Sequence, residues 1–212
     1  MIMVIPYRKI CGALAWTTLI LQYILTVSSG EHGGFASSTL TYLGYFTILT
    51  NILVALAFSV PFMKAESPLR RFFQRQSVRA AIALYILVVC IVYYALLAKI
   101  HNPVGLSAVL NVGLHFLLPV LYILDWLLFA KKDSMSFKHL PLWTAFPAAY
   151  GVFNIIRGAM TGFYPYPFLN ITELGFGAVF INMFGFMLIY AIGGAIFIML
   201  GRRMKSARSL KT

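Results

Sequence analysis

The chain has 212 residues, of which 61% are hydrophobic and only 10% charged, with a formal net charge of +12 and a mean hydropathy of +0.86. A soluble domain of this length carries about 25% charged residues, so this sequence cannot cover a water-facing surface and excludes an ordinary soluble fold. We therefore expect an all-α membrane protein whose apolar surface is covered by lipid.

Six apolar stretches are long enough to cross a bilayer, which takes about 20 residues of helix. They fall near residues 9–28, 40–63, 79–98, 107–130, 141–160 and 176–200. Helices rather than barrel strands are expected, because the runs are long and every backbone polar group must be paired inside its own segment in hydrocarbon. The sequence predicts a single domain, 1–212, built as a bundle of six transmembrane helices.

The basic residues indicate which face of such a bundle is cytoplasmic. With six spans, every Lys and Arg except Lys99 and Arg157 falls on one face. That face collects Arg8, Lys9, Lys64, Arg70, Arg71, Arg75, Arg79, Lys131, Lys132, Lys138, Arg202, Arg203, Lys205, Arg208 and Lys211. The positive-inside rule places it and both termini in the cytoplasm, as in a multi-pass protein of a bacterial inner membrane. The charge is then explained by topology and membrane lipids, and we expect no nucleic-acid partner.

Polar residues inside the predicted spans form one layer in the outer half of the bilayer. At a rise of 1.5 Å per residue, Thr47 and His115 lie roughly 10–12 Å below the outer boundary. Three further polar residues, Asn154, Arg157 and Asn182, lie roughly 5–9 Å below it by the same rise. Because polar groups at membrane depth are costly, residues gathered in one layer are candidates for a functional site.

The spacing of these residues strengthens the case for a shared interior. Thr47 and Asn51 are four residues apart, as are Asn111 and His115, so each pair shares a helix face. The structural alternative is that a Thr bonds to its own helix and that an Asn ties two helices together. Asp125 lies about 15 Å from His115 along the helix, so pairing with the basic residues is its expected role.

Three segments resemble a family of bacterial six-span membrane proteins. They are Tyr45-Phe46-Thr47-Ile48-Leu49-Thr50-Asn51, Asn111-Val112-Gly113-Leu114-His115 with Pro119, and Tyr164-Pro165-Tyr166-Pro167-Phe168-Leu169-Asn170. That family is distantly similar to the androgen-induced proteins of animals, membrane threonine hydrolases that cleave fatty acid esters of hydroxy fatty acids. The resemblance implies that Thr47 and His115 are a catalytic pair. The chain departs from the animal enzymes in placing Pro119 one residue closer to the His and in having Val112 where they have a second His.

The expected activity is hydrolysis of a lipid ester. His115 would act as general base and activate the weakly nucleophilic hydroxyl of Thr47. The candidates for substrate contacts or for donors to an oxyanion are Asn51, Asn111, Asn154, Arg157 and Asn182. We expect no metal or other cofactor, and membrane lipids with a lipid ester substrate as partners.

The alternative is a non-catalytic membrane carrier or a protein that binds a lipid or small molecule. The two halves of the chain show no shared motif, and the sequence gives no sign of the broken helices common in transporters. On sequence alone the hydrolase is therefore favoured over the carrier.

Overall fold

The computed structural model describes residues 4–31, 33–130 and 135–209, and these residues contain helices but no strand. The all-α prediction is thus confirmed. The basic residues Lys131, Lys132 and Lys211 lie outside the described residues. The chain divides into two compact units, Met1–Lys131 and Lys132–Thr212.

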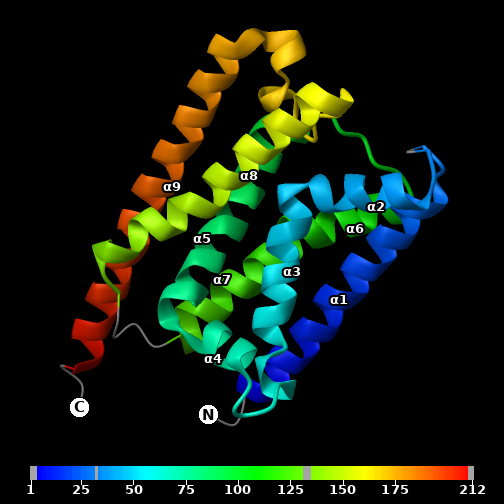
Figure 1. Cartoon of the computed structure of the whole chain (residues 1–212). Helices are drawn as coiled ribbons and strands as arrows, with labels where there is room; N and C mark the ends of the chain where they lie inside the picture. Colours follow the sequence, from blue (N-terminus) through cyan, green and yellow to red (C-terminus); the bar gives the residue numbers. More distant parts are fainter. Residues whose placement is uncertain (1–3, 32, 131–134, 210–212) are drawn as a thin grey trace. The chain divides into compact units, whose positions relative to one another are not determined.

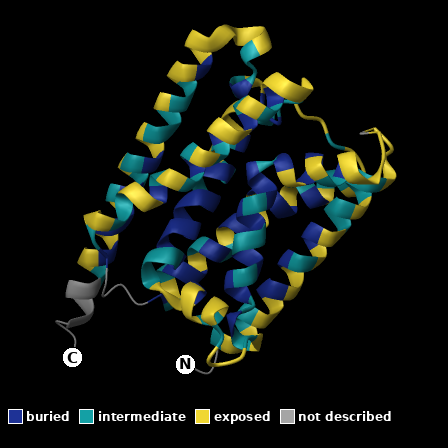
Figure 2. Ribbon diagram, in the orientation of Figure 1, coloured by how far each residue is buried: buried dark blue, intermediate teal, exposed yellow. Residues whose placement is uncertain are grey.

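The first unit is a bundle in which α1, α3, α5 and α7 lie side by side (Figure 1). Its helices are α1 (Val4–Ser28), α2 (Phe35–Gly44), α3 (Phe46–Phe58), α4 (Pro68–Gln74), α5 (Gln76–Val92), α6 (Leu106–Val112) and α7 (Leu118–Phe129), with a short 3₁₀ turn, η1 (Val60–Phe62). Small and branched apolar side chains fill the space between these helices, among them Ala15, Ala55 and Leu118, which are fully buried. Figure 2 shows that buried residues gather where the helices of this unit face one another. Many of the exposed residues are large and apolar.

The second predicted span is broken into two helices. Between α2 and α3 the chain turns by 79° at Tyr45, whose backbone is extended (φ −85°, ψ 128°). The expectation that the chain has no broken helix pair is therefore wrong. Extended backbone at one residue leaves no periodic sequence signal, because the apolar residues continue on both sides of Tyr45. The break places Thr47 in the first turn of α3.

Two helices of the first unit widen into π-helical segments, η2 (Tyr93–Leu97) after α5 and η3 (Gly113–Leu117) between α6 and α7. In η3 the N–H of Leu118 donates to the carbonyl of Gly113, five residues back. The next donor in this register would be Pro119, which has no N–H. Single π turns of this kind are frequently found at functional sites.

The second unit is mainly a pair of contacting helices, α8 (Leu140–Thr161) and α9 (Ile171–Ser209). Two short 3₁₀ turns precede them, η4 (Phe137–His139) before α8 and η5 (Pro167–Leu169) before α9. Gly162 ends α8 in a left-handed conformation (φ 75°), which glycine adopts without steric cost. Gly175 (φ 76°) interrupts α9 near its start.

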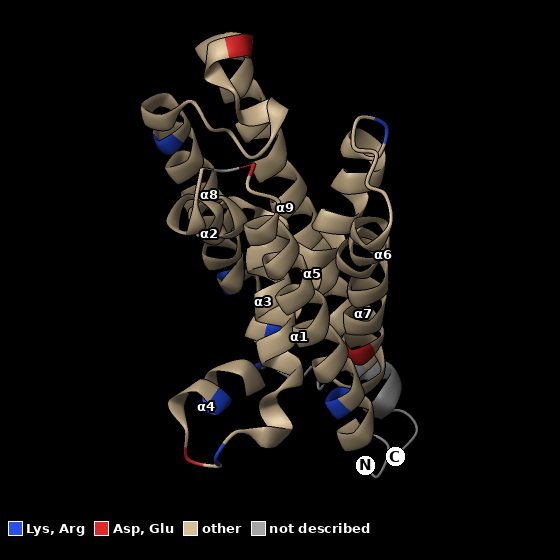
Figure 3. Cartoon of the chain, turned by 90° about the vertical axis from the view of Figure 1, so that its right-hand side faces the viewer, with Lys and Arg blue, Asp and Glu red and all other residues tan. Residues whose placement is uncertain are grey.

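Four helical segments in the described chain are long and apolar enough to cross a membrane, or five if the bent pair α2 and α3 is one span. The four are Val4–Ser28, Gln76–Leu97, Leu106–Phe129 and Ile171–Met204. Helix α8 has the length for a span but is less apolar, since it carries Asn154 and Arg157. Figure 3 shows that most of the helical length carries no charged residue. By length and composition the fold is therefore that of a multi-pass membrane protein with four or five candidate spans among the described residues.

Candidate active site

The structure brings Thr47 and His115 together inside the first unit. Thr47 Oγ1 lies 3.3 Å from His115 Nε2, although the two residues are 68 positions apart in the chain. Both side chains are buried, with exposed fractions of 7% and 9%. A hydroxyl and an imidazole at hydrogen-bond distance have the geometry of a nucleophile and its base.

The hydrogen bond at the other ring nitrogen of His115 determines which of its two nitrogens carries the proton. His115 Nδ1 lies 3.0 Å from the backbone carbonyl of Asn111, one helical turn earlier. A carbonyl oxygen only accepts, so this hydrogen bond places the proton of the neutral ring on Nδ1. His115 Nε2 is then left with a lone pair directed at the Thr47 hydroxyl, which is the protonation state that a general base requires.

Tyr93, which the sequence analysis missed, packs flat against the imidazole. The two ring centroids are 3.8 Å apart and the planes differ by 20°. The Tyr93 hydroxyl accepts a hydrogen bond of 2.7 Å from the Asn111 side chain and lies 3.4 Å from His101 Nδ1. Tyr93 begins η2, four residues before its end, so the depth calculation used for the other polar residues would have placed it in the same layer.

Asn51 holds α3 against the π-helical segment of His115. Its side-chain nitrogen donates to the carbonyls of Thr47 (2.8 Å) and Leu114 (3.2 Å). In the π-helical register the Leu114 carbonyl would accept a hydrogen bond from the backbone N–H of residue 119, but Pro119 has none. The side-chain amide of Asn51 donates to this carbonyl instead. Both amide hydrogens are thereby used, which leaves none for an oxyanion in this structure. The Asn51 side-chain oxygen is buried and has no partner among the described residues.

The start of α3 contributes an electrostatic effect. Thr47 lies in the first turn of a 13-residue helix, where the helix dipole concentrates partial positive charge. A negative charge developing on a substrate carbonyl bound to Thr47 would be stabilised there, as anions are at other helix N-termini. The break at Tyr45 is therefore what gives the Thr47 hydroxyl this environment.

The remaining candidates belong to the second unit. Asn154 is buried and donates to the Tyr150 carbonyl of its own helix, while Asn182 donates to the carbonyl of Phe168. The guanidinium of Arg157 stacks over the ring of Phe163, with its carbon 4.9 Å from the centroid. Asn182 thus ties α9 to the η5 turn, and nothing in these contacts assigns the three residues to catalysis.

Asp125 lies away from the Thr47–His115 pair and forms ion pairs with Arg8 and Arg79. Pairing with the basic residues, as the sequence analysis expects, is confirmed. No group of three or more His, Cys, Asp or Glu side chains placed to hold a metal ion occurs in the described part of the chain.

Comparison of the chain with protein-family models, curated proteins and solved structures finds no match. The family resemblance therefore rests on the three sequence segments alone. What the fold and the site define is a class: an all-helical, multi-pass membrane protein with a Thr–His pair buried between two of its helices.

Proposed function

We propose that this protein is an intramembrane hydrolase that cleaves lipid esters with Thr47 as nucleophile and His115 as general base. The observation that carries the proposal is the 3.3 Å contact between Thr47 Oγ1 and His115 Nε2, in a ring whose Nδ1 faces a carbonyl. Both residues also belong to the polar layer predicted from depth, and the family resemblance implies the same pair.

In the proposed reaction His115 Nε2 takes the hydroxyl proton as Thr47 Oγ1 attacks the ester carbonyl carbon. The tetrahedral intermediate collapses, the carbon–oxygen bond to the alcohol breaks, and the imidazolium returns the proton to that alcohol. Water then attacks the acyl-threonine with His115 again as base, which releases the fatty acid and restores the hydroxyl. The dipole of α3 stabilises both oxyanions.

The surroundings of the pair support a substrate with long acyl chains. Val112 and Phe116 on the same helical stretch are about half exposed, at 49% and 51%, so the outward face beside His115 is apolar. A long acyl chain in the bilayer matches such a face. We propose a substrate that resembles the fatty acid esters of hydroxy fatty acids, whose ester lies between two such chains.

One observation favours the alternative of a carrier. The broken pair α2 and α3 resembles the discontinuous spans that form substrate sites in many transporters, where half-helix N-termini face an anionic group. In that case Thr47 would bind a ligand without reacting with it. The two functions differ in whether an ester bond is broken.

The test is turnover of a fatty acid ester of a hydroxy fatty acid by the purified full chain in lipid nanodiscs. Thr47→Ala and His115→Gln should each lower kcat by at least about a thousandfold. Thr47→Ser should retain activity, since it keeps the hydroxyl. A wild-type protein that binds the ester without cleaving it would refute the hydrolase and support the carrier.

Thr50→Val is the matched control. Thr50 is equally buried one turn along the same helix, but its hydroxyl donates to the carbonyls of Phe46 and Thr47 rather than to a ring nitrogen. We expect this variant to turn over substrate at nearly the wild-type rate. Labelling by a fluorophosphonate probe, lost in Thr47→Ala and kept in Thr50→Val, would identify the nucleophile directly.

For the topology we propose six spans, with α8 as the fifth and both termini cytoplasmic in a bacterial inner membrane. The support is the placement of Lys and Arg, together with a 22-residue α8 that reaches about 33 Å. Its polar residues Asn154 and Arg157 are compatible with a span when other helices cover that face.

A further inference from the structure

The loop between η2 and α6 carries two exposed polar side chains that the proposed reaction does not use. They are Lys99 and His101, two positions apart. Both follow directly on η2, the segment that begins with Tyr93. Lys99 is also one of the two basic residues that the predicted topology does not place on the basic face, so the positive-inside rule does not account for it.

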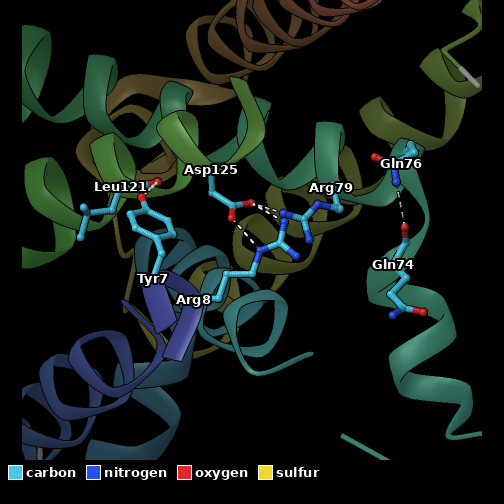
Figure 4. Close-up of polar contacts among 7 residues, drawn as sticks. All are labelled: Tyr7, Arg8, Gln74, Gln76, Arg79, Leu121 and Asp125. Carbon is cyan, nitrogen blue, oxygen red and sulfur yellow. Dashed lines mark hydrogen bonds and ion pairs between the residues drawn. The ribbon is translucent and has the colours of Figure 1, made fainter. Parts of the chain in front are cut away.

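Lys99 has no acidic partner within the described chain. None of the five acidic residues of the sequence falls between positions 67 and 124. Arg8 and Arg79, by contrast, share the carboxylate of Asp125 (Figure 4). The ammonium group of Lys99 is therefore available to a carboxylate that comes from a ligand.

His101 connects this loop to the imidazole of the candidate active site. Its ring meets the ring of Tyr93 edge to face, and the other side of the contact is the stack of Tyr93 on His115. Centroid distances of 6.1 Å from His101 to Tyr93 and 3.8 Å from Tyr93 to His115 place the two imidazoles at most about 10 Å apart. A ligand group held at His101 can thus be joined by a short carbon chain to an ester at the Thr47–His115 pair.

The hydrogen bonds of Tyr93 determine which nitrogen of His101 can donate. The Tyr93 hydroxyl accepts from the Asn111 side chain at 2.7 Å, so its own proton is directed at His101 Nδ1, 3.4 Å away. His101 Nδ1 is then an acceptor, and the proton of the neutral ring is on Nε2. This N–H group belongs to an exposed side chain, so it is a donor for an anionic oxygen.

The residues beside His101 suit the carbon chain of a fatty acid. Ile100 and Val104 are exposed at 65% and 81%. A carboxylate bound at this loop therefore has an ammonium group and an N–H donor for its charge, with exposed apolar side chains next to them for the adjoining methylene groups.

We propose that Lys99 and His101 bind the free carboxylate of the substrate while its ester lies at Thr47. The inference rests on the proposed hydrolase and names the second polar group that the enzyme recognises. Lys99 supplies the charge and His101 Nε2 a hydrogen bond. A fatty acid ester of a hydroxy fatty acid ends in a carboxylate, whereas its methyl ester and triacylglycerols have none. The two residues therefore select the free acid over neutral esters.

Two substrates that differ only at the carboxylate test this selection. They are the free acid and its methyl ester, and cleavage of the ester that joins the two chains is measured with the full-length chain in phosphatidylcholine nanodiscs. Wild-type kcat/KM should be at least about tenfold higher for the acid, chiefly through KM, as expected for hydrogen bonds to a charged group. Equal kcat/KM for the two substrates would overturn the proposal.

Variants of the loop assign the preference to its residues. Lys99→Gln and His101→Phe should each lower the ratio of the two kcat/KM values about threefold or more, and Lys99→Arg should keep it. His101→Phe retains a ring against Tyr93 but removes the donor. Any effect of these changes on the helix end or on the Tyr93 hydroxyl acts on both substrates alike and cancels in the ratio. An unchanged ratio in Lys99→Gln and His101→Phe would refute the assignment.

Lys64→Gln is the matched control, because Lys64 is also an exposed lysine on a loop of the first unit, the one that follows η1. It removes the same charge and should leave the ratio at the wild-type value. A loss equal to that of Lys99→Gln would mean that the acid is drawn by overall positive charge, and the carboxylate site would be wrong.

Binding to Thr47→Ala separates this site from the proposed hydrolysis. The variant lacks the nucleophile, so the radiolabelled acid and methyl ester can be titrated without turnover. Tighter binding of the acid, lost when Lys99→Gln is added, would support the carboxylate site even where the wild type cleaves no ester. Cleavage by the wild type with equal binding of the two compounds would leave the hydrolase standing and refute the carboxylate site.

Discussion

The ring of Tyr93 lies flat against the imidazole of His115, with centroids 3.8 Å apart. The stacking fixes the plane of the imidazole, and the Asn111 carbonyl at Nδ1 fixes its rotation within that plane. His115 Nε2 therefore faces Thr47 without a further orienting carboxylate. Groups held in this way need little rearrangement during a reaction, which is the usual requirement for an efficient site.

Tyr93 should be a positioning residue whose ring matters more than its hydroxyl. Tyr93→Phe keeps the stacking and removes the acceptor of the Asn111 amide, so we expect kcat for ester cleavage to fall about threefold to tenfold. Tyr93→Leu removes the stacking as well and should lower kcat further. Steady-state kinetics with a fatty acid ester measures both. Equal activity of the two variants would show that the stacking does not orient His115.

Asn51 should be required for the structure around the pair rather than for the chemical step. Asn51→Leu keeps the volume but leaves the buried Leu114 carbonyl without a donor, since Pro119 cannot supply one. The free energy of unfolding should fall by about 1–3 kcal/mol. The midpoint of denaturation in detergent checks this, and Asn182→Leu in the second unit is a comparison in which one hydrogen bond is lost instead of two. A variant as stable as the wild type would contradict the role.

The sequence predicted the helical class and placed Thr47 and His115 in one layer because both inferences depend on local patterns, whereas the pairing of the two residues came from the family resemblance. Apolar runs report helices in lipid directly, and a polar residue at membrane depth stands out from its neighbours. The break at Tyr45 and the π turns could not be predicted in this way. They depend on backbone geometry at single residues, where the apolar pattern is unchanged.

The limits of the depth argument are visible in Tyr93 and Asn51. Tyr93 has the depth of the polar layer, but a tyrosine near the end of a span is usually an interfacial anchor and gives no distinct sequence signal. The spacing of Asn51 and Thr47 correctly predicted that the two share a helix face. The role of Asn51 in joining α3 to η3 depends instead on the π-helical register of η3 and on Pro119. Depth and facing therefore identify a layer, whereas hydrogen-bond direction assigns the role of each residue.

Two glycines of α8 should differ sharply in their tolerance of alanine. A Cβ at Gly158 would lie 2.1 Å from the ring of Tyr164, a rigid group, whereas a Cβ at Gly151 would meet the flexible end of Met183. Overpacking of this kind costs about 1–3 kcal/mol. Gly158→Ala should lower the denaturation midpoint and Gly151→Ala should change it little. Equal midpoints would show that Tyr164 moves aside.

Removing the Asp125 carboxylate should destabilise the first unit strongly. Asp125→Ala leaves two guanidinium groups without their shared partner, and loss of one member of a buried ion pair costs about 3–5 kcal/mol. Glu66→Ala, at an exposed position, is the control and should be nearly neutral. Thermal unfolding in detergent distinguishes them. A small effect of Asp125→Ala would mean that water solvates the two arginines.

The six-span proposal predicts opposite sidedness for the two ends of α8. In a chain lacking Cys11 and Cys90, a single cysteine would replace either Lys138, just before α8, or Thr161, the last residue of α8. Both positions are exposed. A membrane-impermeant maleimide added to intact cells should label Thr161→Cys and spare Lys138→Cys until the membrane is opened, because about 33 Å of helix separates the two ends. His101→Cys and Glu66→Cys give the outer and inner references. If both ends of α8 react from the same side, that helix does not cross the bilayer and the six-span topology is wrong. The Thr47–His115 contact would be unaffected by that result, because it lies wholly within the first unit.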